Sequence, residues 1–318
     1  MQLSSAQLQA NKLQALSRSP RLPTPRRHLL KVMSTSAEPK GSSSKTEIKL
    51  IGPEPKRFTV APGQLLTIAS AAFPFLARLG SGGFVLGYRT RLPAEQPGKY
   101  AVLQAGGRAV EESSALIGSL PRPAKPLELY EFEGCPFCRK VREAVCILDL
   151  DVLFYPCPKK GPTWRPKAVE MGGKPMFPYL VDPNTGKAMY ESDDIIRYLF
   201  ETYGGGSSNI PLSLRLGFLT ALTCGLGLAP RGAKGSFYTP SKVPEQPLVY
   251  WGYELSPFCK VVREKLSELE IPHLYHSVAR GSPKRQVPYI EDPNTGVAMF
   301  ESAAIVKYLD ETYGAGTA

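Results

Sequence analysis

Residues 130–142 read YEFEGCPFCRKVR, and this stretch predicts the end of a strand, a tight turn and the start of a helix. Pro136 suits the first position of a helix, which places Cys135 at the N-cap. Cys138 follows one helical turn later, within disulfide reach of Cys135. We therefore interpret the stretch as a Cys-x-x-Cys redox motif at a strand-to-helix junction.

The stretch returns later in the chain with one important exchange. Residues 249–263 read VYWGYELSPFCKVVR, so that Ser256 replaces the first cysteine. Residues 182–203 and 292–313 are identical at 15 of 22 positions, which indicates that one domain is duplicated. Cys138 and Cys259 are 121 residues apart, but Pro178 and Pro288 are only 110 apart, so the first copy carries 11 additional residues between these positions, near Trp164.

The hydrophobic pattern of the first copy predicts alternating strands and helices. Strands are expected at 127–132, 152–155, 179–181 and 188–190, and helices at 136–148 and 193–203. If the variable region around Trp164 also holds a helix, the series is β-α-β-α-β-β-α, which implies an α/β fold with a mixed sheet and helices on both faces. The second copy follows the same order from Pro247 to Tyr313. Two tandem domains, each with its own core, are expected.

Composition divides the chain into five predicted parts: a transit peptide at 1–44, an extension and linker at 45–125, the first domain at 126–204, a linker with an amphipathic helix at 205–246, and the second domain at 247–314. Glycines at 204–206 predict a hinge.

Two apolar stretches lie outside the repeats. Residues 64–79, interrupted by Pro74 and charged at Arg78, are too short and broken to span a bilayer. Residues 210–227 carry leucines at roughly helical spacing and predict an amphipathic helix. We expect 64–79 to pack against the first domain, and 210–227 to bridge or cover the domains. Peripheral membrane contact is the alternative for each stretch.

Positive charge is concentrated at the start of the chain. The formal net charge is +11, of which +7 falls on residues 1–45, where eight Lys and Arg accompany one acidic residue. The remaining +4 gives little support to nucleic-acid binding. A basic, Ser-rich stretch without a continuous apolar run predicts an organelle transit peptide, with a disordered basic tail as the alternative. Its Ser and Pro content favours a plastid over a mitochondrion.

The remaining cysteines and the histidines predict no metal site. Cys146, Cys157 and Cys224 have no partner at ligand spacing and are expected to be buried. His273 and His276 fall on one strand, where residues three apart face opposite sides of the sheet.

The chemistry of the two sites differs. The free amides and the dipole of the helix favour the thiolate of Cys135, which is the nucleophilic form in disulfide exchange. Cys138 is placed to resolve a mixed disulfide. At the second site Ser256 is either a simple helix cap, which we prefer, or a hydroxyl that hydrogen-bonds a bound thiol.

Two pairs of residues recur in both copies. Phe177-Pro178 and Val287-Pro288 each introduce a strand after a loop, where a cis proline would leave the preceding backbone open to a peptide-like ligand; a trans proline is the alternative. Glu191-Ser192 and Glu301-Ser302 open the last helix of each copy. Ser is a natural N-cap there, and the free amides can bind a carboxylate. Asp193-Asp194 follow in the first copy and would repel that carboxylate or pair with an ammonium.

Together, Cys135-Pro136-Phe137-Cys138, Phe177-Pro178 and Glu191-Ser192 resemble the glutaredoxin and glutathione-transferase N-terminal families of the thioredoxin superfamily. The second copy is similar to the plant serine-type transferase half, and the whole chain resembles plastid proteins with two such halves. The resemblance implies thioredoxin-like domains, with Cys135 as nucleophile, Cys138 as resolving thiol and glutathione as co-substrate. It implies a glutathione groove lined by Phe177, Pro178, Glu191 and Ser192 in the first domain, and by Ser256, Val287, Pro288, Glu301 and Ser302 in the second.

The leading hypothesis is a glutathione-linked thiol–disulfide oxidoreductase of the chloroplast, in the stroma or at the thylakoid, acting on protein disulfides or thiols. Glu131 and Glu133 stand where many glutaredoxins carry lysine, and they favour the alternative of a non-enzymatic scaffold or partner-binding protein. Iron–sulfur cluster binding and a transferase-like activity are lesser alternatives. The transferase reading is disfavoured because no large helical domain follows either copy.

Overall fold

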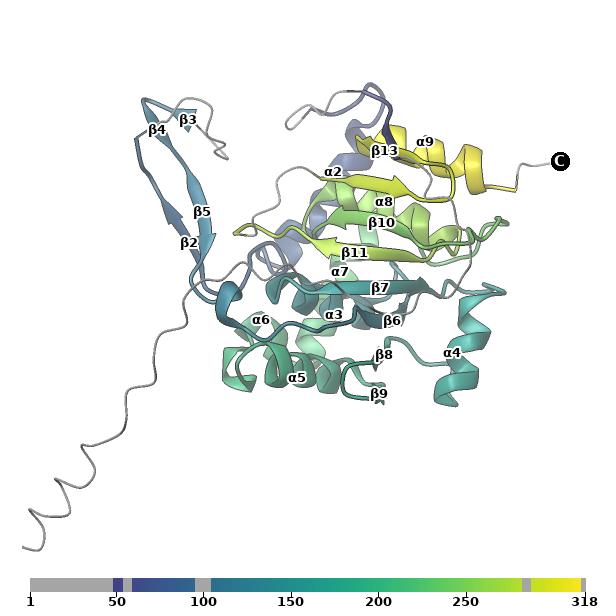
Figure 1. Ribbon diagram of the computed structural model, residues 1–318, viewed down its shortest axis with the longest axis horizontal. Coiled ribbons are helices and arrows are strands. Elements are labelled where there is room, and N and C mark those ends of the chain that lie inside the picture. The colour runs from purple at the N-terminus through teal and green to yellow at the C-terminus, as the bar shows by residue number, and fades with distance from the viewer. Residues whose placement is uncertain (1–47, 54–58, 95–103, 282–286, 316–318) are drawn as a thin grey trace, which may run out of the picture. The chain divides into compact units, whose positions relative to one another are not determined.

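Nine strands form one mixed sheet in a computed structural model of the chain, which describes residues 48–53, 59–94, 104–281 and 287–315 (Figure 1). In spatial order these described strands are β1 (Lys49–Leu50), β13 (Val297–Phe300), β12 (Tyr289–Asp292), β10 (Leu248–Gly252), β11 (His273–Ser277), β7 (Asp151–Pro156), β6 (Leu127–Glu131), β8 (Tyr179–Asp182) and β9 (Lys187–Met189). The predicted transit peptide lies outside the described residues.

Each copy builds one half of the sheet. In the first, α3 (Pro136–Ile147), α4 (Trp164–Gly172) and α5 (Ser192–Tyr203) accompany the strands in the order β-α-β-α-β-β-α. β6 is parallel to β7 and antiparallel to β8, and β10 has the same relation to β11 and β12. The second copy contributes α8 (Pro257–Glu268) and α9 (Ser302–Tyr313). Its described residues contain no counterpart of α4, because the connection is 11 residues shorter, and residues 282–286 within it lie outside the described part.

The two halves meet edge to edge. β7 and β11 pair antiparallel, with Leu153 opposite Leu274 and Val152 opposite Tyr275. Leu274 follows Leu153 by 121 residues, which is also the spacing of the two motif cysteines that the copies share. Equivalent residues therefore face each other, and an approximate two-fold axis through this pair relates the halves.

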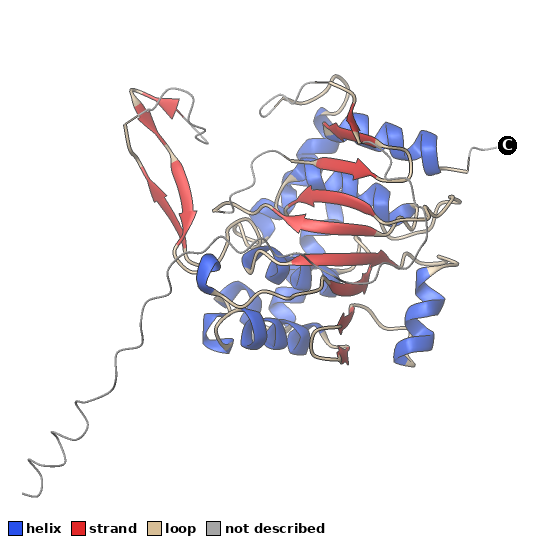
Figure 2. Ribbon diagram, viewed as in Figure 1, coloured by secondary structure: helices blue, strands red, loops and turns tan. Residues whose placement is uncertain are grey.

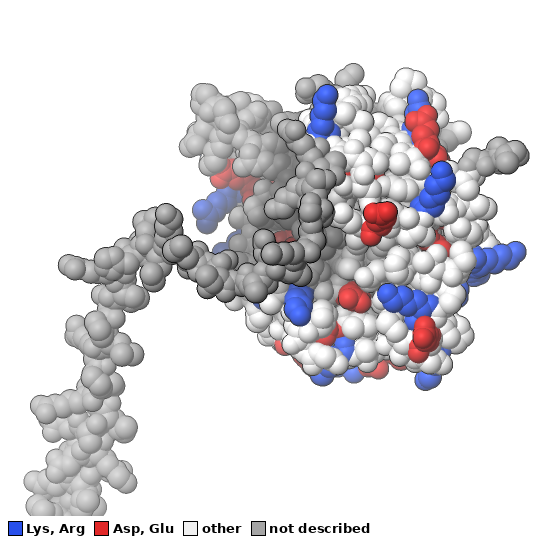
Figure 3. Space-filling view, turned by 45° about the vertical axis from the view of Figure 1, so that its right-hand side comes forward, with Lys and Arg blue, Asp and Glu red and all other residues white. Residues whose placement is uncertain are grey.

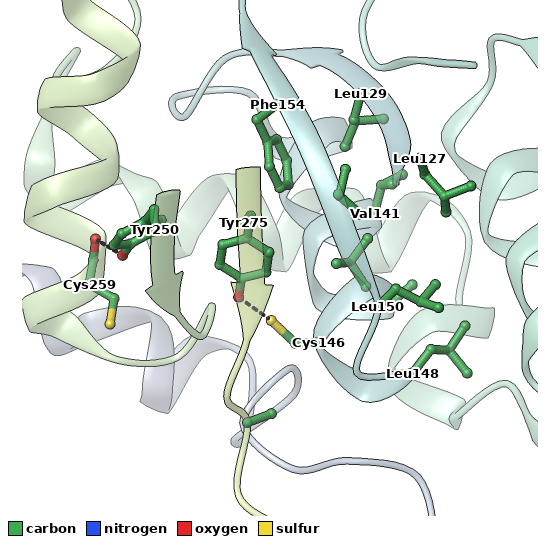
Figure 4. Packing of buried hydrophobic residues seen from close by; sticks show 14 of the residues in the cluster. Leu127, Leu129, Val141, Cys146, Leu148, Leu150, Phe154, Tyr250, Cys259 and Tyr275 are labelled. Carbon is green, nitrogen blue, oxygen red and sulfur yellow. Dashed lines mark hydrogen bonds between the residues drawn. The ribbon is translucent and has the colours of Figure 1, made fainter. Parts of the chain in front are cut away.

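One hydrophobic core runs through both halves. Alternate strand residues, such as Leu129 of β6 and Tyr250 of β10, point to the same side of the sheet and join one buried cluster with α3, α5, α8 and α9. Figure 4 shows part of it, where the Tyr250 hydroxyl donates to the backbone oxygen of Cys259 and the Tyr275 hydroxyl lies 3.1 Å from Cys146 Sγ. The expectation of a separate core for each copy is wrong, because the pairing of β7 with β11 makes both sheet and core continuous.

The other face of the sheet carries aromatic rows. In the first half Tyr130 stacks on Tyr155 at 4.7 Å between ring centroids, and Trp164 of α4 lies 4.7 Å from Tyr155. In the second half Trp251 and Tyr289, with centroids 5.1 Å apart, remain partly exposed. Figure 2 shows most helices gathered behind the strands, with α4 standing apart from them. The first half therefore has helices on both faces.

A helix precedes each copy and belongs to the repeated unit. α2 (Leu65–Ala77) precedes the first copy and α7 (Phe218–Leu228) the second, and a Cβ placed on Gly227 of α7 would lie 3.4 Å from Pro74 of α2. α2 packs on α7 and on α8 of the second domain. The expected packing of this segment against the first domain is therefore wrong in its main contact.

The loop after each of these helices pairs with the opposite domain. Val85 N donates to Arg280 O at 3.1 Å in the second domain, and Tyr238 N donates to Lys159 O at 3.0 Å in the first. Tyr238 follows Val85 by 153 residues, and Arg280 follows Lys159 by 121. The two-fold relation thus extends to the preceding helices and loops, which cross between the halves.

Buried ion pairs cross between the halves in the same way. Glu133 of the first domain contacts Arg263 at 3.1 Å and Lys260 at 2.9 Å, both on α8. Glu254 of the second domain contacts Arg142 of α3 at 2.9 Å. These side chains are at most 5% exposed. Each carboxylate therefore pairs with cations of the other domain.

The helices α2 and α7 add a further matching pair of contacts at their C-terminal ends. Arg78 lies 2.7 Å from Glu143 of α3, and Arg231 lies 2.6 Å from Glu264 of α8. The arginine that follows each of these helices therefore points into the core, where it pairs with a buried carboxylate.

The remaining elements lie in the extension and the linker. β2 (Tyr88–Arg91) pairs antiparallel with β5 (Glu111–Ser114), and β3 (Gln104–Ala105) with β4 (Arg108–Ala109). Short 3-10 turns cover Ile117–Ser119, Ser207–Asn209 and Ala229–Arg231.

The two apolar stretches differ from expectation. The single helix predicted at 210–227 is divided into α6 (Leu212–Arg215) and α7, because Gly217 adopts φ +53° between them. Pro74, by contrast, lies within α2 without ending it. In the described ranges, none of the helices has the length and apolar character needed to cross a membrane. Figure 3 shows cationic and anionic residues interspersed on the face it displays.

Candidate active site

Cys135 caps helix α3. Its backbone is extended (φ −94°, ψ 121°), Pro136 follows in the first turn, and Cys135 Sγ accepts a hydrogen bond from Cys138 N at 3.2 Å. Cys135 is 4% exposed and Cys138 is fully buried. The sequence expectation of an N-cap cysteine with its partner one turn later is confirmed in its geometry.

The two thiols are shifted in opposite directions. Burial raises the pKa of Cys135, but the hydrogen bonds that it receives from Cys138 outweigh burial, so the pKa lies below its usual value. Burial and the neighbouring Cys135 sulfur hold the pKa of Cys138 well above its usual value. The pair is therefore divided into a sulfur that ionises readily and one that keeps its proton.

A backbone carbonyl faces the first sulfur. The Phe177–Pro178 peptide bond is cis, as is Val287–Pro288 in the second domain, so the expected cis prolines are confirmed. Cys135 Sγ lies 3.9 Å from Phe177 O, within reach of a weak S–H donor. The motif and the proline loop, 42 residues apart in sequence, are thus brought together.

Arg165 of α4 stands over the same site, and sequence reasoning missed it. Its guanidinium lies 4.5 Å from the Phe177 ring centroid and 5.7 Å from that of Phe132, while its nitrogens donate to the backbone oxygens of Pro158 and Cys157. The sequence placed several lysines and Trp164 in this region but gave no signal that singled out the arginine. It is a fixed positive charge beside the ring of Phe177, whose backbone oxygen faces Cys135 Sγ.

The start of α5 differs in detail from expectation. Glu191 takes the N-cap position with φ +63° and Ser192 is the first helical residue, so Ser192 is not the cap. A non-glycine residue in this left-handed region is uncommon, and Glu301 repeats it with φ +70°. Asp193 pairs with the buried Lys140 of α3 at 2.6 Å, which shows that it meets an ammonium.

The two acidic residues before the motif are turned away from solvent. Glu131 is 5% exposed and pairs with Arg142, while Glu133 is 1% exposed and pairs with the second domain. Burial raises the pKa of Glu131 to about 7, although Arg142 opposes the shift. The charge of Glu131 raises the pKa of both motif sulfurs. It is therefore a titratable group buried beside the thiol pair.

The second site keeps the helix cap and the cis proline, but Ser256 stands in place of the cysteine. Ser256 caps α8, and its Oγ accepts from Cys259 N at 3.3 Å, as a plain helix cap would. Ser256 and Ser302 are buried, and Val287 precedes the cis proline. Burial raises the pKa of the nearby Tyr253 to about 12, so its hydroxyl stays protonated.

The other cysteines and the two histidines of β11 are dispersed through the fold. Cys146, Cys157 and Cys224 are buried, as expected, and His273 is buried while His276 on the opposite side of β11 is partly exposed. Within the described residues no three His, Cys, Asp or Glu side chains form a group that could hold a metal ion.

Two segments of the chain match the family model of the glutathione S-transferase N-terminal domain, at residues 129–207 and 251–317. Together with the mixed sheet and its helices, the two matches show that the chain carries two tandem thioredoxin-like domains. Both matched segments contain the motif helix, the cis proline and the Glu-Ser pair of their domain.

Solved structures of two transferases are similar to parts of the chain. A glutathione transferase of Bombyx mori is 27% identical over 27% of this chain and 39% of its own, with a TM-score of 0.24. The trimeric Leishmania glutathione transferase TDR1 is 15% identical over 58% of this chain and 68% of its own, with a TM-score of 0.23. This chain thus spans about two fifths of the Bombyx mori protein. No curated protein matches the chain.

Proposed function

We propose that the chain is a glutathione-linked thiol–disulfide oxidoreductase that works through Cys135 and Cys138. The observation that carries the proposal is the asymmetry of the pair: Cys135 is hydrogen-bonded by Cys138 N and has a lowered pKa, whereas the pKa of Cys138 is raised. A thiolate that attacks first and a thiol that is deprotonated later are what dithiol exchange requires.

The reaction conserves sulfur and electrons at each step. The Cys135 thiolate attacks the glutathione sulfur of a protein–glutathione disulfide, so that a Cys135–glutathione disulfide forms and the protein leaves as a thiolate that takes up a proton. A second glutathione, as thiolate, then attacks that mixed disulfide, releases oxidised glutathione and restores the Cys135 thiolate. Alternatively Cys138 loses its proton, displaces glutathione and forms a Cys135–Cys138 disulfide, which two further glutathione molecules reduce.

The proposed glutathione groove in the first domain combines three features. Phe177 and cis-Pro178 offer backbone groups beside the nucleophile, and Glu191 and Ser192 open the N-terminus of α5, which attracts a carboxylate. Arg165 supplies a cation for the second carboxylate of the tripeptide. Because Lys140 already neutralises Asp193, that side chain does not repel the ligand.

The second domain acts in this proposal as a degenerate copy that binds glutathione or a partner. It keeps Val287, cis-Pro288, Glu301 and Ser302, but Ser256 gives no thiolate. Serine in place of the first cysteine also favours a second candidate function, a non-enzymatic scaffold. In that case the shared core joins a domain with a complete cysteine pair to a domain without one. The composition of residues 1–45 supports import into a plastid.

The test is reduction of a small glutathione mixed disulfide, with glutathione as donor. We expect Cys135→Ser to abolish turnover and Cys138→Ser to retain part of it. Cys259→Ser is the matched control, because Cys259 holds the position of Cys138 in the second domain and is equally buried. Ser256→Cys recreates the motif there and should add exchange activity. Absence of turnover in the wild-type chain, with either glutathione or a thioredoxin reductase system, would favour the scaffold.

A further inference from the structure

An apolar surface lies along α2, α6 and α7. Of the 23 large hydrophobic residues that are exposed in the described part of the chain, 12 fall within 65–79 and 212–226. They are Leu65, Leu66, Phe73, Phe75, Leu76, Leu79, Leu212, Leu216, Phe218, Leu219, Leu222 and Leu226, with exposed fractions between 40 and 93%. Concentration of such residues on adjoining elements marks a site that contacts another protein or a membrane.

The outward faces of the two long helices match each other. Leu66 and Phe73 of α2 correspond to Leu219 and Leu226 of α7, each pair 153 residues apart, and all four are exposed. The opposite sides of the same helices are buried, and α2 has no charged residue along its length. A helix that is apolar all round normally occurs where every side is covered. The two-fold relation of the halves thus places two uncovered stripes on one surface.

The surface continues into a groove with a volume of about 510 Å³. Leu79, Phe84, Leu216 and Leu219 line it, and most of its lining is apolar. All four are also exposed, so the groove opens onto the surface defined above. A hydrocarbon chain is a ligand of suitable size and polarity for it.

Leu79 combines high exposure with a backbone conformation that is unfavourable for leucine. It is 93% exposed and adopts φ +49°, a conformation that disfavours residues with a Cβ. The equivalent position in the second unit is Gly232, which follows the 3-10 turn after α7 and has a φ of +60° that glycine adopts without strain. Because the Leu79 side chain is 93% exposed, packing within the described part of the chain does not account for a leucine at this position.

The charges on these segments complement an anionic surface. Residues 59–94 and 204–244 contain no Asp or Glu. Their cations include Arg215 and Lys234, which are exposed, whereas Arg78 and Arg231 are turned inward to buried carboxylates. A second copy of the chain would oppose cations with cations, but anionic lipid headgroups would pair with them.

We propose that the surface formed by α2, α6 and α7 docks on an anionic lipid bilayer, with both stripes immersed in the interfacial layer. The helices would lie in the plane of the membrane, and the groove would receive part of an acyl chain. The proposal is independent of the redox chemistry, because none of its residues belongs to the thiol site.

The test is co-sedimentation of the full chain with vesicles of phosphatidylcholine plus phosphatidylglycerol, or of phosphatidylcholine alone. We expect binding to the anionic vesicles, weakened at least about tenfold by Leu66→Glu or Phe218→Glu. Leu92→Glu is the matched control, since Leu92 is 62% exposed but lies outside the surface. Arg215→Gln should reduce the preference for anionic vesicles.

Leu79→Gly separates docking from folding. Glycine accepts the left-handed backbone, so this variant should unfold at the same temperature as the wild type or above it, yet bind vesicles more weakly. The proposal is overturned if the wild type binds neither vesicle, or if Leu66→Glu, Phe218→Glu and Leu92→Glu bind equally. It is also overturned if the chain is a dimer in the absence of vesicles and the first two substitutions convert it to a monomer, which would identify a second copy as the occupant.

Discussion

The crossed ion pairs between the halves lead to a quantitative prediction about stability. Glu254 faces three guanidinium groups, those of Arg142, Arg139 and Arg263, at 2.9, 2.9 and 3.2 Å. Glu254→Gln keeps the size of the side chain and removes its charge. The three cations, at most 5% exposed, then remain in the core without that partner.

The expected cost follows from the burial of the cluster. Removing one member of a buried ion pair typically costs about 3–5 kcal/mol, because the charge left behind stays desolvated. A domain is stable by roughly 5–15 kcal/mol, so this loss is a large share of the total. Because Glu133 holds the equivalent position against Arg263 and Lys260, Glu133→Gln should cost about the same, within roughly 1 kcal/mol.

Acid should act in the same direction in the wild type. Burial raises the pKa values of Glu133 and Glu254, but the surrounding arginines outweigh it and lower both. A carboxylate with a lowered pKa contributes stability that is present above its usual pKa and is lost as the pH falls through the folded-state value. A Gln variant has no carboxylate to protonate at that position. Its free energy of unfolding should therefore fall less than that of the wild type when the pH is lowered into the acid range.

Urea denaturation, followed by circular dichroism and by tryptophan fluorescence, measures these effects. The continuous core predicts a single transition with an unchanged m-value. Asp194→Asn is the matched control, because Asp194 and Arg197 form a pair in which both side chains are 57% exposed, and it should cost less than about 1 kcal/mol. A loss below about 1 kcal/mol in both Gln variants, or two separate wild-type transitions, would contradict this prediction.

Three further predictions concern single residues. Glu131→Gln should lower the pKa of Cys135, because the charge of Glu131 raises it. The rate of alkylation by iodoacetamide, measured at graded pH, reports this pKa. An unchanged pH profile would show that the charge does not act on the sulfur. His273→Phe should reduce acid sensitivity: burial lowers the His273 pKa from 6.5 to about 4, so the stability that neutral His273 provides is present above 6.5 and lost as the pH falls through about 4. Urea midpoints at neutral and acidic pH test this, and equal acid losses in both proteins would contradict it. Gly235→Ala should destabilise by about 1–3 kcal/mol, because Gly235 has φ +73° and an added Cβ would lie 2.7 Å from Glu133 Cβ, and an unchanged thermal midpoint would count against this close contact.

Much of each site could be predicted from local pattern. Pro136 after Cys135 specifies a helix start with the sulfur at its cap, and the same logic at Ser256 gave the second helix. Repetition of the motif, the proline and the Glu-Ser pair identified two domains of one type. These features depend on residues close together in sequence, whose backbone preferences act before any tertiary contact forms.

The relation between the two copies was decided only by tertiary structure. The register of β7 against β11 joins residues 121 apart, and no local preference records which edges of two sheets will pair. The helices α2 and α7 were missed as parts of the repeat, because their shared role lies in contacts with the opposite domain and few of their residues are identical. Arg165 was missed for a similar reason, since only the packing of α4 places its charge over Phe177.

The acidic residues before the motif show most clearly the difference between what the sequence predicts and what the fold decides. The sequence places Glu131 and Glu133 just before the cysteines, where many glutaredoxins carry lysine, and on that ground they favour a non-enzymatic scaffold. The fold buries Glu133 among cations of the second domain and gives Glu131 a pKa of about 7 beside the thiols. A charge has an energy set by its surroundings, so the chain alone specifies which charges are present and the folded structure decides what each of them does.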